Sequence, residues 1–265
     1  MNTVLTEIDA GVGIVTLNRP DRRNAFDDDA IAALTEVLEN LNADPAVRVV
    51  VLSAAGANFC AGADLHWMKR AAAYSEAENL RDAEALARLL RTLNELPKPT
   101  VARVQGSAFG GGVGLIAACD IALGVFDAHF SLSEVKLGLI PAVISPYVIA
   151  AIGARKARRF MLSAETFSAS EAYRMGLLHE IVADEAALDE AVGETIDTLL
   201  AGAPAAQAEC KSLIAAVAGR PIDEDLIEDT ARRITRVRAS AEAREGMAAF
   251  FERRGPNWSG KQRES

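Results

Sequence analysis

The sequence predicts an α/β fold, and three observations support this prediction. Short segments with strand character alternate with longer helical segments over residues 4–125. Loops rich in glycine and alanine follow the strands, and ligands bind at such strand ends in this fold class. Hydrophobic residues make up 50% and charged residues 25% of the 265 residues, a usual balance for one large globular domain, alone or with a helical appendage.

The first forty residues predict two strands followed by a helix. Residues 4–8 alternate polar and apolar side chains, residues 9–11 form a turn, and residues 12–17 return as a second strand. Residues 28–43 repeat apolar side chains every three or four positions, which predicts an amphipathic helix. Aspartates at 27–29 stand at its start, where the helix dipole favours negative charge.

The middle of the chain predicts the buried strands of a sheet. Residues 48–53, 100–104 and 121–125 are short, mostly apolar segments of the kind that form buried strands. Residues 65–96 are predicted to form one helix, which Pro97 and Pro99 end. A glycine loop before residue 114 leads into an apolar helix. Each strand–loop–helix unit therefore places its loop at a strand end.

The C-terminal part is predicted to be helical. From Pro146 onward helical patterns dominate, and residues 223–239 and 242–254 are strongly amphipathic, so they need a surface to cover. We therefore divide the chain into a core, residues 1–195, and a helical C-terminal region, residues 196–265, although no flexible linker separates them.

Charge and composition argue against several functional classes. The net charge of -9 argues against nucleic acid as the main partner. The chain has no run of 18 apolar residues and no signal-peptide pattern, so no membrane span is expected. Three scattered cysteines and three distant histidines indicate buried thiols in the cytoplasm, with neither a disulfide framework nor a metal site.

Two loops of small residues are the candidates for chemistry. Residues 59–64 and 108–114 each follow a buried strand and open into a helix, whose first N–H groups are unpaired and carry partial positive charge. Two such groups that face one point can stabilise the oxyanion that forms when a thioester is enolised. Taken alone, the triple glycine is more often a tight turn, and it lacks the spacing of nucleotide-binding loops.

Taken together, these segments resemble the crotonase (enoyl-CoA hydratase/isomerase) family over nearly the whole chain. This resemblance implies a crotonase-type spiral of repeated ββα units, followed by a C-terminal helical region that forms trimers. The motifs that support it are Asn18-Arg19-Pro20, Asn24-Ala25 and residues 59–64, 109–114, 133–141, 168–172, 176–178 and 250–254.

The resemblance implies roles for particular residues. The backbone N–H groups of Ala63 and Gly111 would form the oxyanion hole. Substrate and CoA contacts are implied for Arg22, Arg23, Ala25, Ala61, Asp64, Leu65, Gly110, Gly114, Phe250 and Arg253. The two arginines could equally lie on a solvated surface, and Phe250 and Arg253 could simply belong to an amphipathic terminal helix.

Glu134 is the expected acid–base residue. It lies among small and apolar residues, where desolvation should raise its pKa toward a value useful for proton transfer. Gly114 is a departure from the family pattern, because hydratases with two carboxylates carry the second one at this position. A one-carboxylate hydratase and a Δ3,Δ2-enoyl-CoA isomerase therefore both remain open.

A finer resemblance suggests the substrate. Residues 59–69, 110–114 and 139–147 are similar to bacterial methylglutaconyl-CoA and isohexenylglutaconyl-CoA hydratases, which implies a branched, carboxylated 2-enoyl-CoA. Lys69 and Arg70 are candidates for binding the extra carboxylate, although a solvated helix face is their simpler role.

The leading hypothesis is a hydratase that needs no cofactor, because coenzyme A is part of its substrate. It would act as a homotrimer or a dimer of trimers. The alternatives are the isomerase and a non-catalytic RNA-binding protein of the same fold. Only the basic cluster at 155–159 supports the RNA-binding alternative.

Overall fold

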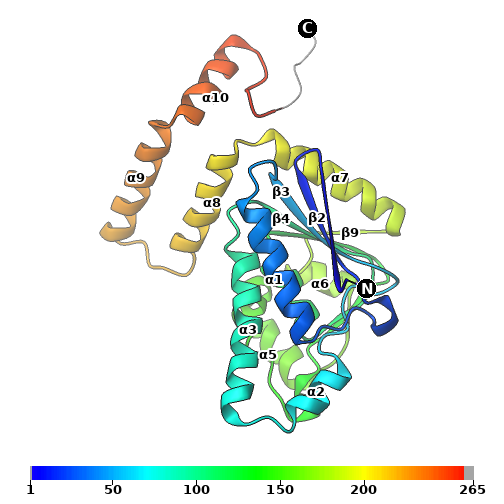
Figure 1. Cartoon of the computed structure of the whole chain (residues 1–265). Coiled ribbons are helices and arrows are strands. Elements are labelled where there is room, and N and C mark those ends of the chain that lie inside the picture. The colour runs from blue at the N-terminus through cyan, green and yellow to red at the C-terminus, as the bar shows by residue number, and fades with distance from the viewer. Residues whose placement is uncertain (1, 260–265) are drawn as a thin grey trace.

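A six-stranded sheet forms the centre of the core (Figure 1). The computed structural model describes residues 2–259, so Met1 and residues 260–265, the outer ends of the two expected regions, lie outside the described part. The sheet has the order β1-β2-β3-β4-β6-β9, with the bounds Val4–Asp9, Val12–Leu17, Val49–Ala54, Thr100–Val104, Ile121–Val125 and Glu180–Val182.

All neighbouring strands of this sheet except the first pair run parallel. β1 and β2 are antiparallel and joined by Ala10 and Gly11, both with positive φ, which confirms the predicted turn. All six residues of β3 are buried, as expected of a strand covered on both faces. Parallel strands with helical crossovers confirm the predicted α/β class.

A second sheet of three short strands extends the core toward the glycine loop. It has the order β5-β7-β8, with the bounds Ala108–Phe109, His129–Ser131 and Phe167–Ser168. β5 runs parallel to β7, and this pairing fixes the backbone immediately before Gly110.

Helices cover the two sheets. α1 (Asp28–Ala43) packs against α3 (Glu76–Asn94), while α4 (Gly111–Ala118) packs against α5 (Ser145–Ser163). α7 (Glu185–Ala201) lies on β4, β6 and β9, and its continuous course includes position 195, where the core was expected to end. The remaining core helix is α6 (Ala169–Met175).

The single helix predicted over residues 65–96 is wrong. The structure contains α2 (Leu65–Ala71), a break, and then α3. Ser75 begins α3 with a capping box, since its side chain accepts from the Glu78 N–H and the Glu78 carboxylate accepts from the Ser75 N–H. The Ser-x-x-Glu pattern in the sequence could have predicted this break.

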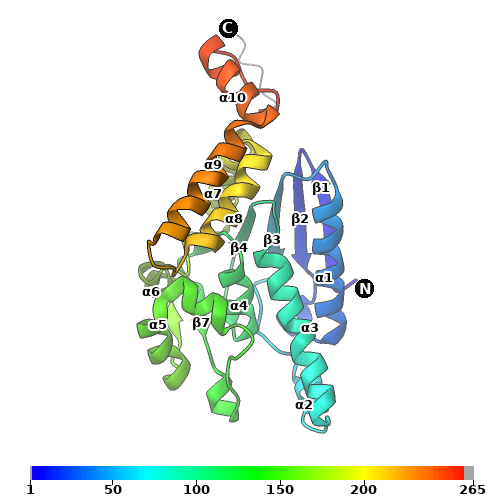
Figure 2. The same ribbon diagram turned by 90° about the vertical axis from the view of Figure 1, so that its left-hand side faces the viewer.

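The last three helices extend from the core (Figures 1 and 2). They are α8 (Pro204–Val217), α9 (Glu224–Arg238) and α10 (Ala241–Glu252), and only Leu226 and Ala249 among their side chains are buried. Lys211 connects α8 to the core through an ion pair of 2.6 Å with Asp120. Within residues 2–259, no helix has both the length and the apolar character that crossing a bilayer requires.

Candidate active site

The two glycine- and alanine-rich loops lie side by side. Cys60 and Ala108 form a parallel β-bridge, and the Phe109 N–H donates to the Cys60 carbonyl at 2.9 Å. Gly62 is in the left-handed region (φ +86), and a Cβ there would lie 2.8 Å from the Phe109 carbonyl oxygen. Only glycine therefore permits this close approach, which brings the ends of two segments far apart in sequence to one place.

The N–H groups of Ala63 and Gly111 are both unused. Phe26 and Ala63 form a parallel β-bridge, in which the Gly62 carbonyl accepts from the Phe26 N–H and the Asp64 N–H donates to the Phe26 carbonyl, each at 2.9 Å. The Ala63 N–H belongs to the same planar trans peptide as the Gly62 carbonyl, so it points away from Phe26. Within residues 2–259, neither the Ala63 N–H nor the Gly111 N–H at the start of α4 donates to an acceptor.

These two donors lie close enough to act on one ligand. The Gly111 nitrogen is 3.7 Å from the Cβ position of Gly62, the residue directly before Ala63. The Gly111 donor also benefits from the positive end of the α4 dipole. Two preorganised N–H groups of this kind can bind an oxygen on which negative charge develops.

The Glu134 carboxylate lies against Gly110, the residue directly before Gly111. Glu134 begins the 3-10 turn Glu134–Leu137, and a Cβ on Gly110 would lie 3.0 Å from its Oε1. Its Oε2 atom is buried and has no hydrogen-bond partner among the described residues. Burial raises the pKa of Glu134, although its own backbone N–H counteracts this. The carboxylate thus has the unmet hydrogen-bonding capacity and raised pKa expected of a proton-transfer group.

Asp64 and Arg22, which were both expected to contact the substrate, form an ion pair with each other. Asp64 caps α2 by accepting from the His66 and Trp67 N–H groups, and its Oδ2 accepts from Arg22 at 2.9 Å and Arg19 at 3.2 Å. Burial alone would raise the pKa of Asp64, but these donors and charges outweigh it and lower the pKa to about 2. Asp64 therefore fixes the backbone beside Ala63.

Asn24 organises the same region, and its side-chain role was missed in the sequence. It is buried with a positive φ of 54°, and its amide donates to the Ala55 and Asn58 carbonyls at 2.7 and 2.8 Å. Its own carbonyl accepts from the Cys60 thiol. The Asn24-Ala25 motif was the available signal, because asparagine tolerates the left-handed conformation and bonds to nearby backbone.

The other expected contact residues near the loops contribute mainly backbone. The Arg23 carbonyl accepts from the Ala61 N–H at 2.9 Å, and the Ala25 carbonyl accepts from the Arg19 guanidinium at 2.7 Å. The side chain of Leu65 is 77% exposed at the start of α2 and is thus free to contact a ligand.

Glycines 111 and 114 have no room for side chains. A Cβ on Gly111 would lie 2.2 Å from the Phe26 ring, and a Cβ on Gly114 would lie 2.3 Å from Cγ2 of Ile144. The absence of a second carboxylate at position 114 is therefore matched by the packing around it.

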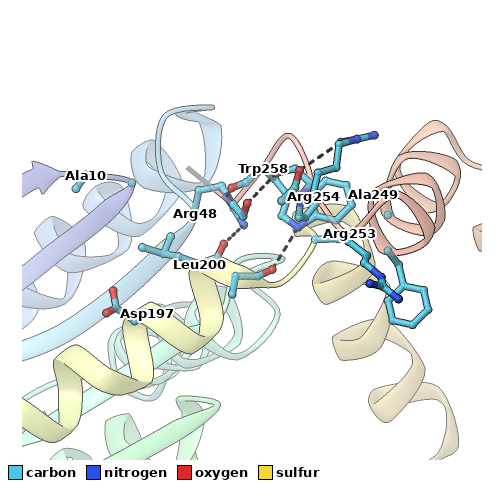
Figure 3. A pocket seen from close by; sticks show the side chains of 16 residues that line it. Ala10, Arg48, Asp197, Leu200, Ala249, Arg253, Arg254 and Trp258 are labelled. Carbon is cyan, nitrogen blue, oxygen red and sulfur yellow. Dashed lines mark hydrogen bonds between the residues drawn. The ribbon is translucent and has the colours of Figure 1, made fainter. Parts of the chain in front are cut away.

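Phe250 and Arg253 do not join the site within one chain. They line a cavity of about 1110 Å³ between the β1–β2 turn, the end of α7 and the C-terminal segment (Figure 3). The Arg48 guanidinium supports its wall by donating to the carbonyls of Leu200, Gly202 and Trp258. Figure 1 places α10 at the opposite end of the molecule from α2.

The candidate cationic groups differ in their surroundings. Arg70 forms an ion pair of 2.7 Å with Asp28, so it is already engaged. In the basic cluster at 155–159, Arg159 pairs with Glu165 at 2.6 Å.

Within residues 2–259 no group of three or more His, Cys, Asp or Glu side chains is arranged to hold a metal ion.

Comparisons with known proteins identify the family of the chain. A family model described as enoyl-CoA hydratase/isomerase matches residues 7–261. A solved enoyl-CoA hydratase from Shewanella pealeana is 45% identical with a TM-score of 0.94, covering 97% of this chain and 96% of that one.

Two further relatives carry different activities in their names. Enoyl-CoA hydratase AFT6-1 of Alternaria alternata is 38% identical over 91% of this chain and 78% of its own length. The 1,2-epoxyphenylacetyl-CoA isomerase of Escherichia coli is 32% identical over 98% of this chain and 100% of its own length. The hydratases among the relatives support general hydratase activity, that of a hydro-lyase. The chain belongs to the enoyl-CoA hydratase/isomerase family and has its crotonase fold.

Proposed function

We propose that this protein hydrates a 2-enoyl-CoA with Glu134 as its acid–base residue. The observation that supports this most is the position of the Glu134 carboxylate, with Oε2 buried and unpartnered, over Gly110 and beside two unused N–H donors. The substrate thioester oxygen would accept from the Ala63 and Gly111 N–H groups, which stabilise it as the enolate forms.

One carboxylate is sufficient for the whole addition. Glu134 takes a proton from water as the water oxygen bonds to C3, and the electrons of the double bond move to the thioester oxygen. When the enolate collapses, Glu134 returns that proton to C2. The hydrogen at C2 and the hydroxyl at C3 both derive from one water, and Glu134 ends in its starting state.

Steady-state hydration of crotonyl-CoA tests this proposal. Glu134→Ala is expected to lower kcat by about 10²–10⁴-fold, the usual contribution of a positioned acid–base group. Lys136→Ala, two residues further along the same turn, serves as the control and should retain activity. Undiminished turnover in Glu134→Ala would contradict the proposal.

A branched, carboxylated acyl group is the finer proposal. Residues 59–69, 110–114 and 139–147 support it through their resemblance to methylglutaconyl-CoA hydratases. Because Arg70 is already paired with Asp28, Lys69 is the better of the two candidates for the extra carboxylate. Lys69→Met should lower kcat/KM for 3-methylglutaconyl-CoA more than for crotonyl-CoA. Equal losses on both substrates would remove this assignment.

The Δ3,Δ2-isomerase is the second candidate, and the closed space at Gly114 favours it. Here Glu134 would take a proton from C2 of a 3-enoyl-CoA and return it to C4, with no water added. Incubating a 3-enoyl-CoA and, separately, a 2-enoyl-CoA in ¹⁸O-labelled water distinguishes the two reactions. An isomerase converts the 3-enoyl-CoA into unlabelled 2-enoyl-CoA. A hydratase leaves the 3-enoyl-CoA unchanged and converts the 2-enoyl-CoA into labelled 3-hydroxyacyl-CoA.

Assembly and compartment complete the proposal. A homotrimer, or a dimer of trimers, is supported by exposed apolar side chains on α10, since Phe250 and Phe251 are 78% and 79% exposed. Such an assembly could place Phe250 and Arg253 at the CoA of a neighbouring subunit. We also propose a reducing cytoplasm, because Cys60, Cys119 and Cys210 are free thiols.

A further inference from the structure

Two residues cover Gly110 and Gly114 at the start of α4. Gly110 and Gly114 stand four residues apart, and the Gly114 N–H donates to the Gly110 carbonyl at 3.2 Å. Gly110 is the N-cap residue of α4, and Gly114 lies about 6 Å further along the helix axis. The Glu134 carboxylate covers position 110, and Ile144 covers position 114. The helix that follows Ile144, α5, also packs against the turn that begins at Glu134, so the two residues approach the same end of α4.

Ile144 fills the space that any side chain at position 114 would need. A Cβ on Gly114 would lie 2.3 Å from Cγ2 and 2.8 Å from Cβ of Ile144. Ile144 is 3% exposed and stands directly before α5, which packs against α4. Since its own Cβ is part of the overlap, a change of rotamer cannot remove the clash.

We propose that Ile144 is a specificity-determining residue that makes this a one-carboxylate site. The inference rests on the proposed function and explains why the site holds a single carboxylate. The aliphatic side chain of Ile144 cannot hydrogen-bond an attacking water, and it fills the space that a second carboxylate at position 114 would need. Ile144 therefore leaves the addition of water at C3 to Glu134, and a second carboxylate in its place would speed hydration relative to proton transfer between C2 and C4.

Thermal unfolding tests the packing part of this proposal without reference to catalysis. Gly114→Ala should lower Tm by about 5 °C or more in the wild type. It should cost little or nothing in an Ile144→Ala background, because the methyl group then has room. Ile152→Ala removes a buried isoleucine (5% exposed) from α5 itself and should give no such relief. Additive Tm losses for positions 114 and 144 would overturn the proposal.

Rates of hydration and isomerisation test the catalytic part. Gly114→Glu combined with Ile144→Ala should raise the ratio of hydration to isomerisation at least tenfold over the isosteric Gly114→Gln with Ile144→Ala. It should also add a second ionisation to the pH profile of kcat. Equal ratios for the Glu and Gln variants would overturn the proposal.

The single variants keep the test decisive if the Glu variant does not fold. Ile144→Ala alone should raise the same ratio by admitting water beside Glu134, whereas Ile152→Ala should not. An unchanged ratio in Ile144→Ala would overturn the proposal. Failure of the proposed function would show separately, as full activity in Glu134→Gln, and would overturn the catalytic part while the Tm coupling persists.

Discussion

At the residue scale, Glu134 opposes the stability of the fold. Its Oε2 atom is buried without a partner, and burial raises the pKa of this carboxyl. A raised folded-state pKa favours the protonated form, so the carboxyl stabilises the fold below the unfolded pKa and loses this contribution as pH rises through the folded pKa. At neutral pH the ionised, poorly solvated carboxylate therefore costs stability.

We predict that Glu134→Gln raises Tm at pH 7 by a few degrees while it lowers activity. Glutamine keeps the shape and carries no charge, so its advantage over the wild type should grow between pH 4 and pH 8. Calorimetry at several pH values measures this difference. A Tm advantage that is constant with pH would mean that ionisation of Glu134 is not its cause.

Asp64 behaves in the opposite way, because its pKa is lowered to about 2. The contribution of Asp64 to the stability of the fold is fully present above the usual aspartate pKa of 3.8, and it is lost as the pH falls toward 2.

Asp64→Asn should therefore cost roughly 1–2 kcal/mol at pH 7, and progressively less below pH 4. The loss comes from the contacts with Arg19 and Arg22, since asparagine can still cap α2. Asp21→Asn is the control, because Asp21 is exposed and lies 3.9 Å from the same Arg22. Equal losses in both variants would contradict a special role for Asp64.

At the element scale, the break between α2 and α3 depends on one cap. We predict that Ser75→Ala costs about 1 kcal/mol and lowers Tm by about 2–4 °C, because the α3 N-terminus loses its side-chain acceptor. Ser75→Asp keeps an acceptor and should stay near the wild-type Tm. If the alanine variant unfolded at the wild-type temperature, the capping box would not stabilise α3.

Most strands and helices could be predicted from the sequence because their signals are local. The apolar residues of β3 and the periodic apolar positions of α1 are examples. The short strand β9 was missed, since three residues give no period and its pairing with β6 depends on tertiary contacts. The helix predicted over residues 65–96 failed because its apolar periodicity was weighed without the cap.

The candidate site was predictable only in part, because some of its contacts join residues far apart in the sequence. The small residues Ala63 and Gly111, and the single Glu134 among small and apolar residues, can be recognised in the sequence. The contact between Ile144 and Gly114 joins residues thirty positions apart, and no local sequence pattern predicts it.

At the scale of the whole molecule, α8, α9 and α10 extend away from the core (Figure 2), and they expose several apolar side chains. Ile214 on α8, Ile222 in the connection to α9 and Phe251 on α10 are 66%, 86% and 79% exposed, and large exposed apolar patches are typical of interaction surfaces. The Lys211–Asp120 ion pair keeps α8 on its own core, so these apolar side chains stay exposed on the single chain.

We predict a solution mass three or six times the chain mass of 28.1 kDa by light scattering. Phe251→Glu should lower that mass, because a charge would be buried at the interface. Leu162→Glu, a 72% exposed position on α5, is the matched control and should leave the mass unchanged. A wild-type protein of 28.1 kDa in solution would contradict the assembly.

In the proposed mechanism, the N–H groups of Ala63 and Gly111 bind the thioester oxygen while Glu134 moves the proton. A crystal structure with a bound acyl-CoA would show these contacts. We predict that the thioester oxygen lies about 2.7–3.1 Å from both nitrogens, as oxyanion-hole donors require, with the Glu134 carboxylate facing C2 and C3. A thioester oxygen bound elsewhere, with either amide still unpaired, would rule out this oxyanion hole.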